Sequence, residues 1–145
     1  MYHIKEISTD DPLYQRERIL RNEVLLRPIG IKDFGWEHKD RQCVHVVARE
    51  KHTQNVVGCI LLHTPKDSSS GQLMQMAVNP SHQKRGLGKS LVKKCLEVAK
   101  AYGLKTVFCN SRETAVGFYE KVGFKKRGNY FLEVGIKHLK MEIEL

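Results

Sequence analysis

The chain has 145 residues, of which 41% are hydrophobic and 28% are charged, and these proportions are typical of a single globular domain that buries a core. No apolar run is long enough to cross a membrane, and the N-terminus lacks the apolar stretch of a signal peptide, so we expect a cytoplasmic protein without a membrane partner. The formal net charge of +9 favours an anionic partner such as nucleic acid or a polyphosphate cofactor, although a basic surface can also serve solubility alone.

The four cysteines predict neither a metal site nor a disulfide. No pair of them has the two-residue separation that is common in zinc and redox motifs. Each lies among apolar residues, so we expect buried thiols in a reducing compartment. These residues are Cys43, Cys59, Cys95 and Cys109.

The first 40 residues predict a strand and a helix. Residues 2–8 read as a short strand, and two acidic residues followed by Pro12 are typical of a helix start. We expect this helix to end near Pro28. Residues 29–40 predict a loop or a short second helix, in which Trp36 and the neighbouring glycines indicate a folded segment over a cleft.

The middle of the chain predicts three strands followed by a long helix. Residues 43–48 and 56–63 are β-rich runs joined by a polar turn, which is the pattern of a hairpin, and residues 73–78 predict a third strand. Apolar residues then recur at helical spacing over residues 88–102. Gly103 is expected to end that helix as a left-handed cap.

The last third of the chain predicts a strand, a short helix and a closing pair of strands. The strand spans residues 106–109, and the helix stops at Gly123. The closing strands span residues 124–134 and 137–145. This order predicts one mixed α/β domain over residues 1–145, with a strand–helix–strand crossover at its centre.

Residues 72–90 combine an apolar strand, an Asn-Pro turn, a basic loop with two glycines and the start of an amphipathic helix. Such a layout points backbone N–H groups and the positive end of a helix dipole at one spot, which binds phosphate. Basic residues gather around this loop, which favours a local anion site over a diffuse surface charge. They are Lys84, Arg85, Lys89, Lys93 and Lys94.

Three kinds of phosphate motif can be compared with this loop. A nucleotide P-loop ending in Gly88-Lys89-Ser90 requires a glycine where the chain has Gln83. The dinucleotide fingerprint requires a third glycine where the chain has Leu91. The pattern that does fit is Gln-x-x-Gly-x-Gly over residues 83–88, directly after a strand and at the opening of a helix.

This loop, together with residues 76–80 before it and residues 115–124 after it, resembles the GNAT superfamily of acyl-CoA-dependent N-acetyltransferases. The resemblance covers most of residues 55–145 and is looser over the first 50 residues. It implies a central mixed sheet of six to seven strands, splayed open into a V and flanked by helices. It also implies acetyl-CoA in the gap as co-substrate, and no metal.

The resemblance and the loop chemistry together indicate which residues contact the cofactor. Glycines let the backbone approach the pyrophosphate without a Cβ clash, and the pantetheine arm could pair with the strand before the loop as if it were another strand. Many relatives have Asn where this chain has Arg112, so the usual amide contact is missing. Arg112 could reach the cofactor or the acceptor instead, and Asn110 lies two positions earlier. The full set is Met76, Ala77, Val78, Gln83, Lys84, Arg85, Gly86, Leu87, Gly88, Lys89, Ser90, Asn110, Arg112 and Phe118.

The resemblance further implies direct attack of a primary amine on the thioester, with no acyl-enzyme. It places Tyr119 beside the CoA sulfur, where a phenol can protonate the departing thiolate; the alternative is a core aromatic. The oxyanion donor would be a backbone N–H near Ala77 or Val78. The sequence does not identify the general base, because Gln75 is the polar residue in the middle of the strand and an amide cannot accept a proton at neutral pH.

The acceptor is expected to be a small-molecule amine rather than a protein. Arg21 could pair with an acidic group of the acceptor, or it could lie on an ordinary exposed helix face. His138 could hold the acceptor or act as a base, or it could be a surface or packing histidine. The final strands could form the edge of a homodimer. Two other functions are a CoA-binding module without catalysis and a basic nucleic-acid-binding domain; the absence of a helix-turn-helix or an aromatic platform disfavours the second.

Overall fold

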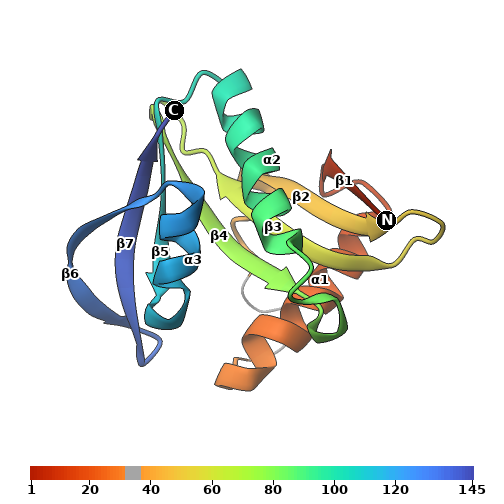
Figure 1. Cartoon of the computed structure of the whole chain (residues 1–145). Coiled ribbons are helices and arrows are strands. Elements are labelled where there is room, and N and C mark those ends of the chain that lie inside the picture. The colour runs from red at the N-terminus through yellow and green to blue at the C-terminus, as the bar shows by residue number, and fades with distance from the viewer. Residues whose placement is uncertain (32–36) are drawn as a thin grey trace.

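The computed structural model describes residues 1–31 and 37–145, which form one mixed sheet with helices on both faces (Figure 1). The strand order is β1-β2-β3-β4-β5-β7-β6. The strands are β1 (Tyr2–Ile7), β2 (Cys43–Glu50), β3 (Val56–His63), β4 (Ser70–Val78), β5 (Thr106–Arg112), β6 (Lys125–Glu133) and β7 (Ile136–Glu144). The α-helices are α1 (Leu13–Arg21), α2 (Leu87–Ala101) and α3 (Val116–Val122).

The strand pairing confirms the predicted fold class. Neighbouring strands are antiparallel except β4 and β5, which are parallel and are joined through α2. This is the strand–helix–strand crossover that the sequence predicts. Helix α1 packs on one face of the sheet against β3 and β4, and α2 packs on the other face against β2, β3 and β4.

Local signals in the sequence account for the helix ends. The carboxylate of Asp11 accepts a hydrogen bond of 2.8 Å from the backbone N–H of Leu13, the first residue of α1. Helix α1 continues into a π-helical turn, Asn22–Leu26, and a short 3-10 turn that ends at Gly30. Gly103 has a φ of 82° and ends α2 as predicted. The predicted position of Trp36 over a cleft lies outside the described residues.

Two strands at the centre of the sheet are longer than the sequence predicts. Strand β4 begins at Ser70, three residues before its predicted start, although residues 66–71 are of the polar type that favours a turn. The reason is that Ser69 accepts backbone hydrogen bonds from the start of β5. Strand β5 continues past Cys109 to Arg112, because its last three residues pair with β7. Long-range pairing thus overrides the local turn signal.

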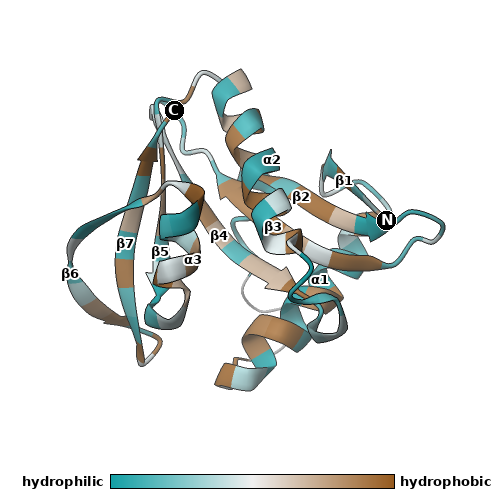
Figure 2. Ribbon diagram, viewed as in Figure 1, coloured by the Kyte–Doolittle hydropathy of each residue, from teal (hydrophilic) through white to brown (hydrophobic). Residues whose placement is uncertain are grey.

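The core has two parts, one on each face of the sheet. The larger part packs α2 and α3 against β2–β5 and β7, and the smaller part packs α1 against β1–β4. In Figure 2 the brown, hydrophobic segments run along β2, β3 and β4, the strands against which α2 packs. Within the described ranges, no helix is both long and apolar enough to cross a membrane.

Candidate active site

The two parallel strands separate part-way along their length. Strand β4 pairs with β5 only from Ser70 to Leu73, opposite Thr106 to Cys109. Figure 1 shows the two ribbons side by side near the C-terminus and far apart at their other ends. Over residues 76–78, the flank of β4 that faces β5 therefore has no strand partner in the part of the chain that the structure describes.

A β-bulge accompanies this separation. Met74 lies opposite Leu61 and Ala77 lies opposite Cys59, so β4 has one residue more than β3 between these pairs. Gln75, within the bulge, has a φ of 51°, which is a left-handed conformation that non-glycine residues seldom adopt. Its side-chain oxygen is buried, and no described residue donates a hydrogen bond to it. Sequence analysis finds Gln75 only as a mid-strand amide, because nothing local signals a bulge there.

The loop between β4 and α2 is held by its own side chains. The amide nitrogen of Gln83 donates to the carbonyl oxygen of Val78 at 3.1 Å, and the side chain of Asn79 accepts from the backbone N–H of Ser81 at 3.0 Å. Two residues then adopt left-handed conformations, Lys84 with a φ of 63° and Gly86 with a φ of 76°. Gln83, predicted to contact a cofactor, thus also fastens the loop to the end of β4.

Helix α2 leaves its first backbone N–H groups open. Its first backbone hydrogen bond runs from the N–H of Ser90 to the carbonyl oxygen of Gly86 at 3.1 Å, so the N–H groups of Leu87, Gly88 and Lys89 lack intrahelical partners. The hydroxyl of Ser90 donates to the same carbonyl oxygen at 3.2 Å and so points back into the helix. With the helix dipole, these amides form an anion-binding end.

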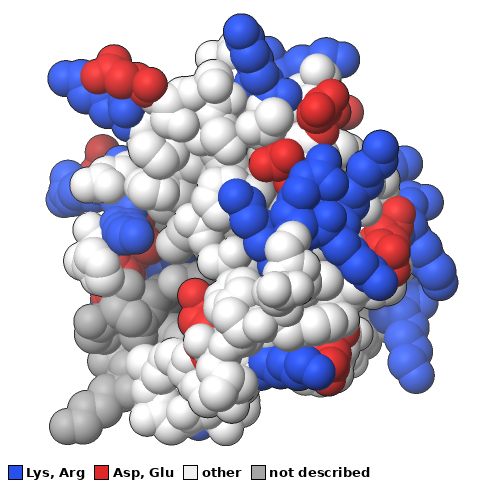
Figure 3. Space-filling view, turned by 90° about the vertical axis from the view of Figure 1, so that its left-hand side faces the viewer, with Lys and Arg blue, Asp and Glu red and all other residues white. Residues whose placement is uncertain are grey.

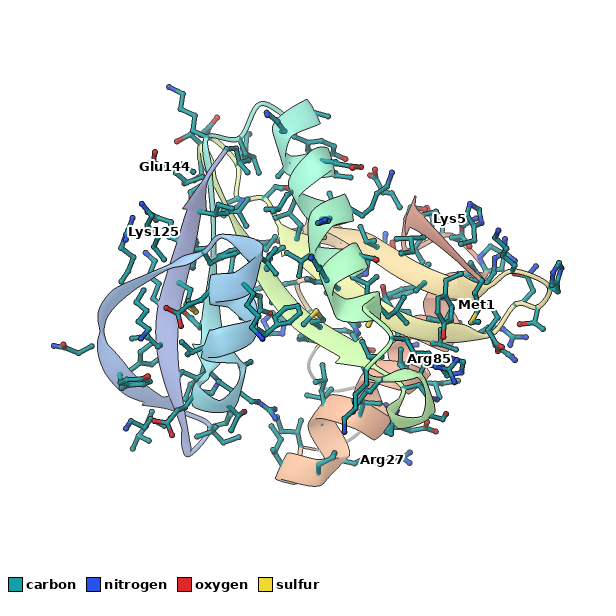
Figure 4. The ribbon with its side chains drawn as sticks, viewed as in Figure 1. Met1, Lys5, Arg27, Arg85, Lys125 and Glu144 are labelled. Atoms are coloured by element: carbon teal, nitrogen blue, oxygen red, sulfur yellow. The ribbon has the colours of Figure 1, made fainter. Side chains whose placement is uncertain are left out.

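Three exposed cations surround this helix end. Lys84 and Lys89 extend into solvent, and Arg85 donates to the hydroxyl of Tyr2 at 3.1 Å. Figure 4 shows Arg85 near Met1, beside the start of α2, so the N-terminus lies next to the loop. The structure brings together the basic side chains and the open N–H groups that the sequence predicts at one place.

Helix α3 faces the start of α2 across a narrow space. A Cβ atom added to Gly88 would lie 3.5 Å from the ring of Phe118 and 3.8 Å from the side chain of Met76. These predicted cofactor residues therefore line one space, between the unpaired part of β4 and α3.

Tyr119 lies on α3 with 7% of its surface exposed. Its ring makes edge contacts with Phe118 at 5.0 Å and with Phe124 at 5.4 Å between ring centroids. Burial raises the pKa of the Tyr119 phenol above its ordinary value of 10.0, so the group keeps its proton at neutral pH. Burial likewise raises the pKa of the nearby Cys109 thiol, to about 12.

Side-chain alternation along β5 places Asn110 and Arg112 on the face of the sheet opposite α2 and α3, away from Gly88 and Phe118. Cys109 and Leu139 belong to the core beneath α2 and α3, so Arg112 and its Cα partner His138 lie on the opposite face of the sheet. Asn110 shares that face with Arg112. His138 is buried, donates from Nδ1 to the carbonyl oxygen of Ile136 at 2.7 Å, and stacks on Phe131.

Arg21 is neither on an exposed helix face nor open to a ligand from solvent. It is fully buried, and its guanidinium contacts Asp40 at 2.5 and 3.2 Å. His45 donates to Glu17 at 2.9 Å and to the backbone carbonyl of Asp40 at 2.7 Å, so it is a satisfied core histidine. One ligand atom from each of Glu17, Asp40 and His45 lies within 4.8 Å of the other two, which is close enough to hold a metal ion. The carboxylates of Glu17 and Asp40, however, already accept hydrogen bonds from neighbouring protein groups.

The buried cluster of Arg21, Asp40, His45, Glu17 and Tyr14 was not found in the sequence. Its one local signal is the spacing of Glu17 and Arg21, four residues apart on α1, which equally suits an exposed ion pair. Residues 14–21, 40 and 45 are brought together only when α1 packs on the sheet.

Comparisons with known proteins agree with this geometry. The model of the acetyltransferase (GNAT) domain matches residues 34–145. A UPF0039 protein of Schizosaccharomyces pombe is 32% identical over 108 residues, covering 73% of this chain and 71% of that protein.

Two solved structures share the fold at low sequence identity. An acyl-CoA N-acyltransferase of Pseudomonas aeruginosa has a TM-score of 0.83 at 19% identity, covering 98% of this chain and 99% of that one. An aminoglycoside 6′-N-acetyltransferase complexed with coenzyme A has a TM-score of 0.81 at 17% identity, covering 98% of this chain and 96% of that one. The match of the domain model over most of the chain shows that this protein belongs to the GNAT acetyltransferase family.

Proposed function

We propose that this protein transfers an acetyl group from acetyl-CoA to the primary amine of a small molecule. One observation carries the proposal: β4 leaves β5 directly beside a helix end whose backbone N–H groups are open. An extended pantetheine arm and a pyrophosphate need these two features side by side. The structural neighbour that binds coenzyme A has the same fold, which supports this assignment.

The start of α2 suits the pyrophosphate of the cofactor, and the flank of β4 suits its pantetheine arm. The N–H groups of residues 87–89 would bind the pyrophosphate, with Lys84, Arg85 and Lys89 adding charge. The unpaired flank of β4 would bind the amides of the pantetheine arm by strand-like hydrogen bonds. The space between Gly88, Phe118 and Met76 would then lie along the arm.

In this proposal the amine nitrogen attacks the thioester carbonyl directly. The carbon–sulfur bond breaks and the thiolate takes a proton from the phenol of Tyr119. The proton that the amine loses passes through solvent and restores the phenol. The raised pKa of Tyr119 keeps this donor protonated, and a backbone N–H near Ala77 or Val78 would bind the oxyanion. The raised pKa of Cys109 leaves its thiol protonated and unreactive, which favours direct transfer over an acyl-cysteine.

The test is release of the free thiol from acetyl-CoA in the presence of a panel of amines, together with calorimetric titration of coenzyme A. We expect binding and amine-dependent thiol release. Binding without release by any amine would favour a non-catalytic CoA module. If neither occurs and a random DNA duplex binds with a steep dependence on salt, the basic surface has a different role.

A further inference from the structure

We propose that the acceptor amine also carries an anionic group, such as a carboxylate, and that Arg112 binds this group. The inference rests on the proposed function, because it concerns the acceptor of the same reaction. It assigns Arg112 to the acceptor rather than to the cofactor. Four features of the described residues support it: the face on which Arg112 lies, its place along β5, its lack of a counter-ion, and the charges around it.

Arg112 lies on the face from which the acceptor must come. The loop, α2 and α3 all lie on the other face, where the cofactor would lie against Gly88 and Phe118. Direct attack requires the amine to reach the thioester while the cofactor occupies its own side. The acceptor therefore approaches from the face that carries Arg112 and His138.

Arg112 also lies beside the opening between the strands. Pairing of β4 with β5 ends at Cys109, so residues 110–112 border the gap on one side while residues 76–78 border it on the other. Arg112 is the last residue of β5. An anion held there would lie near the gap without entering the space of the pantetheine arm.

Among residues 1–31 and 37–145, the guanidinium of Arg112 has no counter-ion. The side chain is half-buried, yet it makes no hydrogen bond or ion pair in the part of the chain that the structure describes. The carboxylates nearest in sequence and on the neighbouring strands are engaged elsewhere: Glu113 with Lys137 at 3.0 Å and Glu133 with His138 at 3.6 Å. A partly desolvated cation without a partner is costly, and a bound carboxylate would satisfy it with two parallel hydrogen bonds.

The surrounding charges favour the same kind of ligand. Lys140 lies two residues from His138 on this face, with its ammonium 4.7 Å from the centre of the Phe108 ring. Glu142 on the same face is already paired with Arg127 at 3.5 Å. In Figure 3, which looks onto the side formed by β6 and β7, blue Lys and Arg side chains outweigh red acidic ones. Basic side chains therefore dominate this side of the molecule, which favours an anionic ligand.

The experiment compares amino acids with their carboxamides, and phosphoethanolamine with ethanolamine, as acetyl acceptors. Each pair differs in one anionic group, and the second pair distinguishes a phosphate from a carboxylate. We expect kcat/KM to favour the anionic member of the preferred pair by about 10- to 100-fold, the effect of a charge-assisted hydrogen bond. Arg112→Gln should bring this ratio close to one while the affinity for acetyl-CoA stays unchanged.

The matched control is Lys126→Gln, which removes the same charge from an exposed position on β6. It should keep the wild-type ratio. Equal loss of activity on anionic and neutral acceptors in Arg112→Gln, weakened binding of acetyl-CoA in that variant, or no preference within any pair in the wild type would overturn the proposal.

A binding measurement separates this inference from the proposed function. The melting temperature of the protein with coenzyme A is measured with each amine, which requires no turnover. Stabilisation by the anionic amines alone, abolished in Arg112→Gln, would support the acceptor site even if no thiol is released. Thiol release with no discrimination by charge would leave the transferase function standing and reject the anionic acceptor.

Discussion

At the scale of single residues, Tyr119 offers the most direct test of the chemistry. Replacing it with Phe keeps the ring that packs on Phe118 and Phe124 and removes only the hydroxyl. We expect kcat to fall about 100-fold, at the low end for a lost general acid, because the thiolate would then leave without a proton donor. Stopped-flow or steady-state thiol release measures the rate, and calorimetry should show unchanged affinity for acetyl-CoA.

A companion variant distinguishes the hydroxyl from the packing. Phe118→Leu alters the neighbouring ring contact and leaves the phenol in place. It should change cofactor affinity more than kcat. If Tyr119→Phe turns over at the wild-type rate, Tyr119 is a core aromatic and the proton comes from elsewhere.

Gln75 shows strain that a single substitution can release. Its left-handed φ of 51° costs a non-glycine residue about 1 kcal/mol or more, and its buried side-chain oxygen has no donor in the part of the chain that the structure describes. Gln75→Gly should therefore raise the free energy of unfolding by about 1 kcal/mol, measured by urea denaturation. Gln72→Gly on the same strand is the control: Gln72 has no such φ, and its change should destabilise the protein. Equal effects at both positions would show that the bulge stores no strain.

At the scale of elements, a substitution at the start of α2 should change stability and cofactor binding in different ways. In Gly88→Ala the added methyl group would contact Phe118 at an ordinary distance of 3.5 Å, and alanine is the better helix former by about 1 kcal/mol. We expect a melting temperature that is equal or higher. The same methyl group narrows the space between α2, Phe118 and Met76, so affinity for acetyl-CoA should fall at least about tenfold by calorimetry.

Gly103→Ala at the other end of α2 is the opposite case. Its φ of 82° makes any side chain costly, while nothing lies within 4 Å of the added atom. It should lower stability by about 1 kcal/mol and leave binding of acetyl-CoA unchanged. If stability and affinity for acetyl-CoA fall together in both Gly88→Ala and Gly103→Ala, this division of roles is wrong.

The elements also show which parts of the site a sequence can predict. The loop over residues 83–90 is a local pattern of glycines, cations and helix start, and its open N–H groups lie where the pattern predicts them. The bulge at Gln75 depends on the register of β4 against β3, and the extension of β5 to Arg112 depends on pairing with β7, so neither follows from the residues of the strand itself. Local propensity does not reveal these two features, so the sequence predicts an end of β5 that is three residues too early.

Arg21 illustrates the same limit for charged residues. A helix with an acidic and a basic residue four positions apart predicts an exposed ion pair. Here the pair is buried because Asp40 and His45, from other segments, complete its hydrogen bonds. Only the three-dimensional arrangement supplies those partners.

At the scale of the whole molecule, this buried cluster joins three separate parts of the chain. Glu17, Arg21 and Tyr14 come from α1, Asp40 from the turn before β2, and His45 from β2 itself. Both ring nitrogens of His45 face acceptor oxygens, so the protonated ring satisfies both. Burial acts to lower the pKa of His45, but the hydrogen bond and charge of Glu17 outweigh it and raise the pKa above the ordinary 6.5.

This raised pKa predicts how the stability of the protein depends on pH. The folded state holds the proton more tightly than the unfolded state does, so the stabilisation is complete below pH 6.5 and is lost as pH rises through the raised value. The free energy of unfolding should therefore fall above pH 6.5, by at most about 1.4 kcal/mol per pH unit for one proton. Urea denaturation from pH 6 to pH 8.5 measures this slope. This pH range lies below the ordinary pKa of the cysteine thiols.

The control removes the proton without leaving a buried charge unpaired. Changing His45 alone would strand the carboxylate of Glu17, so Glu17→Gln is combined with His45→Gln, while Arg21 keeps its pair with Asp40. The double variant should be less stable overall yet show a flat profile over this range. A wild-type slope that persists in the double variant would assign the titration to another group, and the cluster would then act only as a fixed anchor between α1 and β2.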